Sequence, residues 1–256
     1  MIMTIDAGNT NIVLGGFTGG KLKFISRIST DAAKTDFEYA ATIQSIMTIN
    51  GIEKDKVSGS IISSVVPQIT MRLKKAVRMV CGVSPLVVGP GIKTGINLLV
   101  DDPAQVGADI ICACVAAFNL YKPPVLITDM GTATKMIVVD ERAAFMGVSI
   151  IPGVEISLKA LAGGTAQLPQ ISMDSPGKVI AKNTVECMQS GIIYGNASLV
   201  DGMIDRICDE IGEMGSFVAT GGLAETVIPH CKHHIKIDDD LILKGLYIIY
   251  NKNIQN

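Results

Sequence analysis

Two aspartates in this sequence follow apolar stretches and open similar turns. Asp6 comes after residues 2–5 and begins Asp-Ala-Gly-Asn-Thr, whereas Asp129 comes after residues 124–128 and begins Asp-Met-Gly-Thr-Ala-Thr. β-rich residues follow both turns, so each stretch predicts a β-hairpin. A carboxylate at the end of a buried strand can hold hydrated Mg²⁺, and the turn offers N–H and hydroxyl donors to phosphate oxygens. These residue types therefore predict a nucleotide phosphate site.

The first turn also has a simpler interpretation. Glycine and asparagine tolerate positive φ, and an aspartate side chain can accept a hydrogen bond from its own backbone. Residues 6–10 can therefore form a stable turn without any ligand. The second copy favours function, because the two hairpins lie about one domain length apart and indicate two related halves facing a shared cleft. A chain of 256 residues suits two small domains, which we expect at residues 1–118 and 119–256.

A third carboxylate, Asp109, is the only charge in residues 104–118, AQVGADIICACVAAF. A lone carboxylate among apolar side chains is costly unless it is paired or used, so Asp109 is a candidate general base. A structural aspartate held by a neighbouring loop is the alternative. The preceding Asp-Pro-Ala-Gln at 102–105 predicts a helix start with Asp102 as the N-cap.

The remaining periodicity supplies the elements that position these residues. In the first half, a strand at 22–28 follows the hairpin, and helices at 34–50 and 68–81 alternate with strands at 59–66 and 85–88. This is the order of a ribonuclease-H-like half-domain. In the second half we expect a strand at 145–153, a helix at 154–161, helical residues 183–211 interrupted near Gly191 and Gly195, a strand at 217–222 and a helix at 241–251. Thr184 either caps its helix or meets an anionic ligand at the helix N-terminus.

Composition narrows the class of partner. The formal net charge is −2 and no cluster of lysines and arginines occurs, which argues against nucleic acid. No run of about 18 apolar residues predicts a membrane span. Six cysteines lie mostly in apolar helical stretches with no secretory signal before them, so we expect reduced thiols and a cytoplasmic protein.

Two other motifs are weaker than they look. Residues 15–21, GGFTGGK, nearly match a P-loop, but Leu22 replaces the required Ser or Thr and the segment joins two strands. His230, Cys231, His233 and His234 resemble a metal cluster. They occupy a short connecting loop without a second spaced pair of ligands, so we expect no metal there.

Taken together, the motifs resemble one family. Paired hairpins of this kind are similar to the phosphate motifs of the superfamily of sugar kinases, heat-shock ATPases and actin. The chain has D-x-G-N-T-N at 6–11, G-P-G-I-K-T-G at 89–95, D-P-x-x-V-G-A-D at 102–109, D-x-G-T-A-T at 129–134, T-A-x-L-P at 165–169, N-T at 183–184, S-G-x-x-Y-G at 190–195 and T-G-G-L-A at 220–224. Their order resembles that of type III pantothenate kinases over nearly the whole chain.

The resemblance implies an α/β fold of two ribonuclease-H-like (actin-like ATPase) half-domains with a nucleotide cleft between them. It implies transfer of the ATP γ-phosphoryl group to the primary hydroxyl of pantothenate, the first step of coenzyme A biosynthesis. The implied cofactors are ATP, Mg²⁺ and a monovalent cation, K⁺ or NH₄⁺. The implied assembly is a homodimer.

Residue roles follow from the same resemblance. The resemblance assigns nucleotide binding to nine residues, which are Asp6, Ala7, Gly8, Asn9, Thr10, Asn11, Ile12, Val13 and Thr132. It assigns substrate binding to six residues, which are Val100, Gly107, Ala108, Asp109, Ile110 and Thr184. Asp109 would be the general base, while Asp6 and Asp129 would hold metal ions, Asp129 the monovalent cation.

Three positions depart from the family pattern, which usually has Tyr, Arg and Thr where this chain has Val100, Ile110 and Lys135. An arginine can bind the substrate carboxylate by charge-assisted hydrogen bonds, and isoleucine makes none. The Lys135 ammonium either occupies the cation site or is a solvated charge at the strand start. These departures leave open an alternative function, a catalytically weak, kinase-derived binding or regulatory protein of the same fold.

Overall fold

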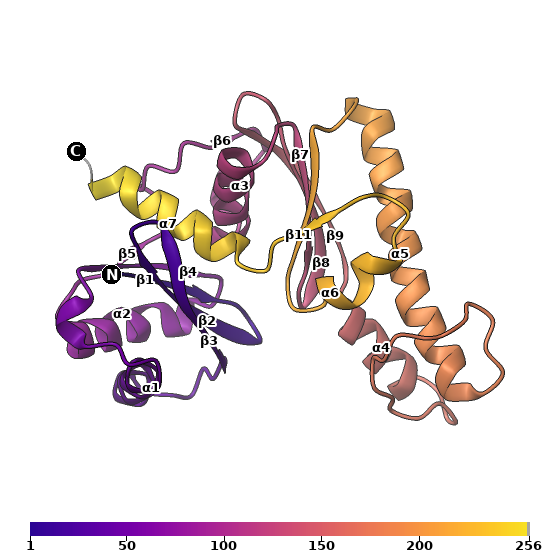
Figure 1. Ribbon diagram of the computed structural model, residues 1–256, viewed down its shortest axis with the longest axis horizontal. Helices are drawn as coiled ribbons and strands as arrows, with labels where there is room; N and C mark the ends of the chain where they lie inside the picture. Colours follow the sequence, from indigo (N-terminus) through magenta and orange to yellow (C-terminus); the bar gives the residue numbers. More distant parts are fainter. Residues whose placement is uncertain (255–256) are drawn as a thin grey trace. The chain divides into compact units, whose positions relative to one another are not determined.

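The computed structural model describes residues 1–254, and the chain divides into two compact units, each built around one mixed β-sheet (Figure 1). Unit 1 contains residues 1–96 and 102–116 together with the segment that begins at Leu241. Unit 2 contains residues 97–101 and 117–240. The first expected hairpin therefore lies in unit 1 and the second in unit 2.

The sheet of unit 1 has the strand order β3-β2-β1-β4-β5. Its strands are β1 (Ile2–Ala7), β2 (Asn11–Thr18), β3 (Lys21–Ser29), β4 (Gly59–Ser64) and β5 (Leu86–Val87). The first three strands pair antiparallel, and β4 and β5 join in parallel on the other side of β1. The expected order of three strands, helix, strand, helix and strand is confirmed in this unit.

Helices cover both faces of this sheet. The helices α1 (Asp36–Ile49) and α2 (Pro67–Cys81) pack in one apolar cluster with Met3 and Ile5 of β1. Residues of α3 (Ala108–Leu120) and α7 (Leu241–Ile254) pack with Phe17 and Ile61 in a second cluster. Because successive strand side chains point to opposite faces, Asp6 of β1 shares the face that α3 covers.

The sheet of unit 2 repeats this arrangement in the order β11-β10-β7-β8-β9-β6. Its strands are β6 (Asn97–Leu98), β7 (Val125–Met130), β8 (Ala133–Val139), β9 (Ala144–Pro152), β10 (Ser216–Thr220) and β11 (Lys236–Ile237). The strands β7, β8 and β9 form an antiparallel meander, and β10 and β11 extend the sheet in parallel beside β7. The expected fold class, α/β with two ribonuclease-H-like sheets, is confirmed.

One face of the second sheet is covered by α4 (Val154–Gly163), α5 (Thr184–Ile211) and α6 (Ala224–Val227). Leu126 and Met130 of β7 belong to the same apolar cluster as Ile193 of α5. Asp129 therefore points to the other face of this sheet. This is because neighbouring positions on a strand alternate between faces.

The long helix α5 is continuous, so the expected interruption near Gly191 and Gly195 is wrong. A helical glycine costs only about 1 kcal/mol relative to alanine. Burial of the apolar face of α5, including Met188 and Ile192, outweighs that cost, because tertiary packing supplies most helix stability in proteins.

The start of the Asp109 helix also differs from the expectation. Asp102 does cap the chain, because its carboxylate accepts from Ala104 N–H at 3.1 Å and Gln105 Nε2 at 2.8 Å. The capped element is a 3₁₀ turn, η2 (Pro103–Gln105), and α3 begins only at Ala108. Asp109 consequently lies in the first turn of α3 rather than in its middle.

The last helix packs on the first sheet. The sequence groups residues 241–254 with the half 119–256, whereas α7 contacts β1, β2 and β4 of unit 1. Gly59 of β4 leaves room for the Tyr250 ring of α7, and Gly15 of β2 leaves room for Leu243. The remaining short elements are the 3₁₀ turns η1 (Lys54–Lys56) and η3 (Ile228–His230).

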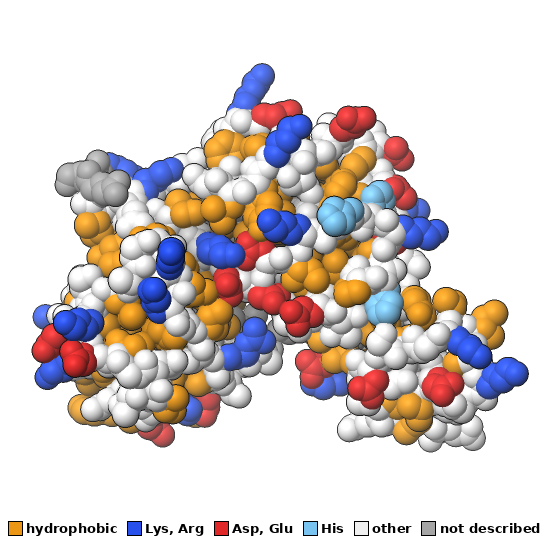
Figure 2. Space-filling view, in the orientation of Figure 1, with side chains coloured by type: hydrophobic (Ala, Val, Ile, Leu, Met, Phe, Trp, Pro, Cys, Tyr) orange, Lys and Arg blue, Asp and Glu red, His pale blue; other side chains and the backbone are white. Residues whose placement is uncertain are grey.

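Surface character bears on possible partners. None of the helices within residues 1–254 combines the length and apolar character that a membrane span needs. Figure 2 shows hydrophobic side chains exposed among charged ones on the visible face. Exposed apolar side chains in unit 2 include Val179, Ile180 and Val185.

Candidate functional site

The turn between β1 and β2 is tight and presents polar side chains. The Gly8 N–H donates to the Asn11 carbonyl oxygen at 2.9 Å, and the Thr30 hydroxyl of the neighbouring segment donates to the Gly8 carbonyl at 2.6 Å. Asn9 and Thr10 at the tip are exposed. Their side chains are therefore accessible to an anion, as the predicted phosphate site requires.

Asp6 and Asp109 both act electrostatically on one buried thiol. Burial raises the pKa of Cys112 on α3 well above its usual value, and the negative charges of Asp6 and Asp109 raise it further. Asp6 pairs in register with Val13 of β2 and with Ser63 of β4, whose hydroxyl also faces Cys112. The structure thus brings together two of the predicted site residues, which are far apart in the sequence.

The first turn of α3 holds Asp109 in a defined position. Its Oδ1 accepts from the Ile110 N–H at 2.8 Å, and the side chain is half-buried. A Cβ at Gly107 would overlap this Oδ1, so only glycine leaves the carboxylate its place. A carboxylate here also interacts favourably with the positive end of the helix dipole.

The second hairpin places a lysine against its aspartate. Asp129 of β7 and Lys135 of β8 are directly opposite each other in the antiparallel register. The Lys135 Nζ lies 2.7 Å from Asp129 Oδ2, and the two side chains are only 16% and 8% exposed. At the tip, Gly131 N–H donates to the Ala133 carbonyl at 3.2 Å and Thr132 is exposed.

Two glycines allow other segments to approach this second turn. A Cβ at Gly153, which follows β9, would overlap the Thr132 carbonyl. Gly221 has φ +94°, and a Cβ there would lie 2.6 Å from the Met130 carbonyl carbon. Leu223 N–H donates to the Met130 carbonyl at 3.3 Å, which fixes the turn after β10 against the end of β7. The T-G-G-L turn at 220–223 and Gly153, the residue after β9, therefore both pack on the hairpin of β7 and β8.

Thr184 is not the cap of its helix. Asn183 is the N-cap of α5, and its side chain accepts from Glu186 N–H at 3.0 Å. Thr184 is exposed and lines a cavity of about 720 Å³ together with Leu161, Leu168, Cys187 and Met188. Its hydroxyl is therefore accessible to a ligand.

Comparison with known proteins identifies the family. The model of the type III pantothenate kinase family matches residues 2–206. A curated type III pantothenate kinase from Exiguobacterium sp. is 43% identical over 253 residues, which cover 99% of this chain and 99% of the relative. This chain belongs to the type III pantothenate kinase family.

Solved structures agree with the fold at low sequence identity. A structure described as a conserved Baf family transcriptional activator from Campylobacter jejuni gives a TM-score of 0.61 at 17% identity, covering 99% of this chain and 100% of the other. Component A of (R)-2-hydroxyglutaryl-CoA dehydratase from Acidaminococcus fermentans gives 0.58 at 13% identity, covering 100% of both chains. These similarities show a shared fold and carry no information about the substrate.

Two departures from the family pattern now have a structural setting. Ile110 is 8% exposed, so its side chain is buried although the adjacent Asp109 is half-buried. Val100 follows β6 in unit 2 and is half-buried. The predicted substrate residues 107–110 lie with Asp6 in unit 1, whereas Val100, Thr132 and Thr184 belong to unit 2.

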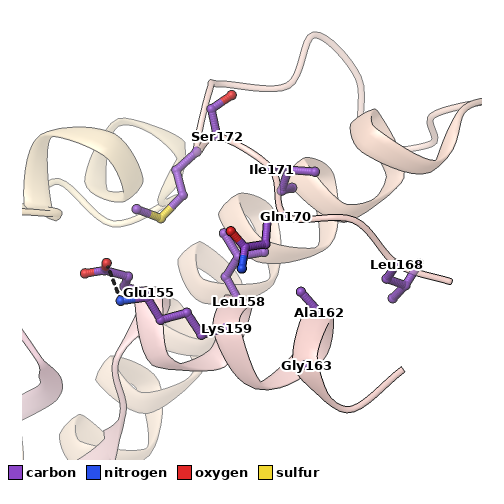
Figure 3. A pocket seen from close by; sticks show the side chains of 10 residues that line it. Glu155, Leu158, Lys159, Ala162, Gly163, Leu168, Gln170, Ile171 and Ser172 are labelled. Atoms are coloured by element: carbon purple, nitrogen blue, oxygen red, sulfur yellow. Dashed lines mark ion pairs between the residues drawn. The ribbon is translucent and has the colours of Figure 1, made fainter. Parts of the chain in front are cut away.

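A second cavity of about 360 Å³ lies beside α4 (Figure 3). Glu155 and Lys159 line it and form an ion pair of 2.8 Å along one helical turn, with both side chains largely exposed. Leu158, Leu168 and Ile171 make much of the remaining wall apolar. Leu168 also lines the Thr184 cavity, so the loop after α4 contributes to both.

The histidines that follow α6 contact different neighbouring side chains and do not share a partner. His233 Nε2 lies 2.8 Å from Asp205 Oδ1, and His230 Nε2 lies 3.0 Å from the Ser175 hydroxyl. Among residues 1–254 no three histidine, cysteine or acidic side chains gather as a metal-binding group. The contacts of these two histidines therefore belong to different parts of unit 2.

Proposed function

We propose that this chain transfers the γ-phosphoryl group of ATP to the primary hydroxyl of pantothenate, the first step of coenzyme A biosynthesis, with Asp109 as the general base. Membership of the type III pantothenate kinase family supports the reaction. The observation that carries the role of Asp109 is its position in the first turn of α3, the helix that covers the sheet face to which Asp6 belongs.

Phosphoryl transfer requires mainly positioning and charge neutralisation, with one group to accept the proton of the nucleophile. In this proposal the turn at residues 8–11 holds phosphate oxygens through its backbone N–H groups and the exposed Asn9 and Thr10. Asp6 is a carboxylate beside Ser63, and such hard oxygen donors suit Mg²⁺. When bound, Mg²⁺ neutralises negative charge on the ATP phosphates. Asp109 then accepts the proton of the pantothenate hydroxyl.

The remaining roles follow from the family and the accessibility of each residue. Thr132 at the tip of the second hairpin contacts ATP, and Thr184 at the start of α5 contacts pantothenate. Both are exposed. The backbone of Gly107 and Ala108 directly before Asp109 completes the pantothenate contacts.

The variant Asp109→Asn tests the general base. An amide keeps the size of the side chain but accepts the nucleophile's proton poorly. The kcat should therefore fall by about 10²- to 10⁴-fold, while the unfolding temperature stays close to that of the wild type. Pantothenate-dependent ADP release measures kcat, and thermal unfolding checks the fold. The matched control is Asp55→Asn, because Asp55 is an exposed carboxylate of η1 in the same unit.

Unchanged turnover of the Asn variant would remove Asp109 from the mechanism. A wild-type protein that binds ATP or pantothenate but releases no ADP would instead favour the alternative, a binding or regulatory protein of the kinase fold. The buried Ile110 is the observation that keeps this alternative open, because a buried isoleucine offers no charge to a substrate carboxylate.

We also propose a homodimer in the cytoplasm. Exposed apolar side chains such as Val179 and Ile180, the latter 85% exposed, favour burial against another protein surface. Sedimentation velocity should give twice the chain mass of 27.0 kDa, and a species of one chain mass at micromolar concentration would exclude the dimer. All six cysteines are free thiols, which agrees with a reducing compartment.

A further inference from the structure

The ion pair of the second hairpin raises a question about the cation that the family resemblance assigns to Asp129. Asp129 is buried, with 8% of its side chain exposed, and lies near the end of β7. The Lys135 ammonium is 2.7 Å from its Oδ2, with 16% of the lysine side chain exposed. A positive charge thus already lies at hydrogen-bond distance from the carboxylate, within the protein and largely shielded from solvent.

The strand register of the second hairpin explains why Lys135 contacts Asp129. Asp129 and Lys135 are directly opposite residues of an antiparallel pair, so their side chains emerge on the same face of the sheet. The pair therefore needs no loop movement or induced fit to form. A solvated lysine at the start of the strand, the alternative from sequence, does not describe this buried ion pair.

Only the second of the two hairpins has a lysine opposite its aspartate. Asp6 occupies the position in β1 that Asp129 occupies in β7, and its direct partner in β2 is the apolar Val13. The two hairpins therefore repeat the same backbone and the same aspartate but differ in the residue opposite. We interpret this difference as a division of roles in which the first aspartate is suited to Mg²⁺ and the second to a fixed ammonium.

Charge and donor chemistry make Asp129 a poor site for an additional monovalent cation. Lysine carries a compact ammonium with three N–H donors, the same charge and hydrogen-bonding chemistry as NH₄⁺. A second cation bound to this carboxylate would be repelled by Lys135 in a weakly screened environment. The residues present therefore do not fit a diffusible K⁺ or NH₄⁺ at Asp129.

We propose that the Lys135 ammonium supplies the positive charge at the second phosphate hairpin, so that this kinase works without K⁺ or NH₄⁺. The inference rests on the proposed function for its activity readout, but not for its binding readout. Removing the ammonium should open the site to a diffusible cation. The variant Lys135→Thr does so with the residue that the family pattern usually has at this position.

The activity experiment compares salts at equal ionic strength. For the wild type, kcat/KM for ATP should change by less than about twofold between tetramethylammonium, potassium and ammonium chlorides. For Lys135→Thr it should fall by about tenfold or more in tetramethylammonium chloride and recover in potassium or ammonium chloride, a usual size for coupling between an ion and a ligand. Lys75→Thr is the control, because Lys75 is 63% exposed and lies 3.9 Å from Asp36 in unit 1. It should behave like the wild type.

A second measurement does not depend on turnover. The unfolding temperature of the wild type should be the same in potassium and tetramethylammonium chlorides, whereas that of Lys135→Thr should rise specifically in potassium or ammonium chloride. Activation of the wild type by more than about twofold with K⁺ or NH₄⁺ would overturn the proposal, as would a K⁺-specific rise in its unfolding temperature.

The two readouts separate the failure of this inference from the failure of the proposed function. If no salt supports pantothenate-dependent ADP release, the proposed function fails, and the unfolding temperatures still decide the role of Lys135. If Lys135→Thr does not fold, the salt series on the wild type decides it.

Discussion

At the scale of single residues, Ile110 distinguishes this chain most clearly from the family pattern. Its side chain is 8% exposed and directly follows Asp109 in the first turn of α3. An arginine there would bring a guanidinium into an apolar environment, which is costly without a carboxylate partner. The acceptor pocket therefore has to hold the pantothenate carboxylate by other means, or to bind it weakly.

The variant Ile110→Arg tests this account of the pocket, alone and together with Val100→Tyr. Without substrate the unfolding temperature should fall, and pantothenate should restore part of the loss by pairing with the guanidinium. The KM for pantothenate should fall by roughly 10- to 10³-fold, since charge-assisted hydrogen bonds contribute about 1.5–3 kcal/mol each. Most of the change should appear in KM rather than kcat, because the carboxylate does not react.

Steady-state kinetics and thermal unfolding with and without pantothenate are the measurements, and Ile110→Leu is the isosteric control. A folded arginine variant whose KM for pantothenate is unchanged or higher would show that the carboxylate is held elsewhere.

The sequence indicates which elements carry the candidate site residues, but it does not place all of these residues in space. The contact between Asp129 and Lys135 follows from the hairpin register, so spacing alone could have predicted it. The approach of Asp6 and Asp109 to Cys112 depends on how α3 packs against β1, and no local pattern encodes that packing. Cys112 is one of six cysteines that lie mostly in apolar stretches, and no sequence signal distinguishes it from the others.

At the scale of elements, the hairpin of β7 and β8 depends on close approaches between backbone segments. Gly221 has φ +94° and lies where a Cβ would contact the Met130 backbone, and Leu223 bonds the same residue. The turn after β10 can therefore pack on the end of β7 only with glycine at position 221. A side chain there would separate the two segments.

The variant Gly221→Ala should reduce stability by about 1–3 kcal/mol, because alanine is strained at positive φ and its Cβ would overlap Met130. The KM for ATP should rise, since the turn next to the second hairpin would move. Chemical denaturation and ATP kinetics are the measurements. Gly195→Ala in the exposed middle of α5, where nothing lies within 4 Å, is the control and should stabilise the protein by up to about 1 kcal/mol. Equal stabilities of the Gly221 variant and the wild type would contradict the packing argument.

The elements that sequence patterns predicted well are those with strong local signals. The strands of both hairpins and the helix α2, whose apolar residues recur at helical spacing, are found close to their expected bounds. The interruption expected in α5 and the early start expected for α3 are wrong. Local propensity around Gly191 was outweighed by burial of the helix, and a cap at Asp102 serves a 3₁₀ turn as well as an α-helix.

At the scale of the whole molecule, one architecture occurs twice. The order β3-β2-β1-β4-β5 in unit 1 corresponds to β9-β8-β7-β10-β11 in unit 2, and both place an aspartate at the end of the first strand. The sequence predicted this repeat from the two hairpins. It did not predict that α7 packs on the first sheet, because contacts between segments so distant in the chain leave no periodic signal.

The most direct test of the central claim is the stoichiometry of the reaction with the wild-type protein. Purified protein, ATP and Mg²⁺ are incubated with and without pantothenate, and ADP and phosphopantothenate are quantified together by mass spectrometry. The account predicts one phosphopantothenate for each ADP, with no ADP released above background when pantothenate is omitted. ADP release that is independent of pantothenate, or bound nucleotide without any product, would contradict it.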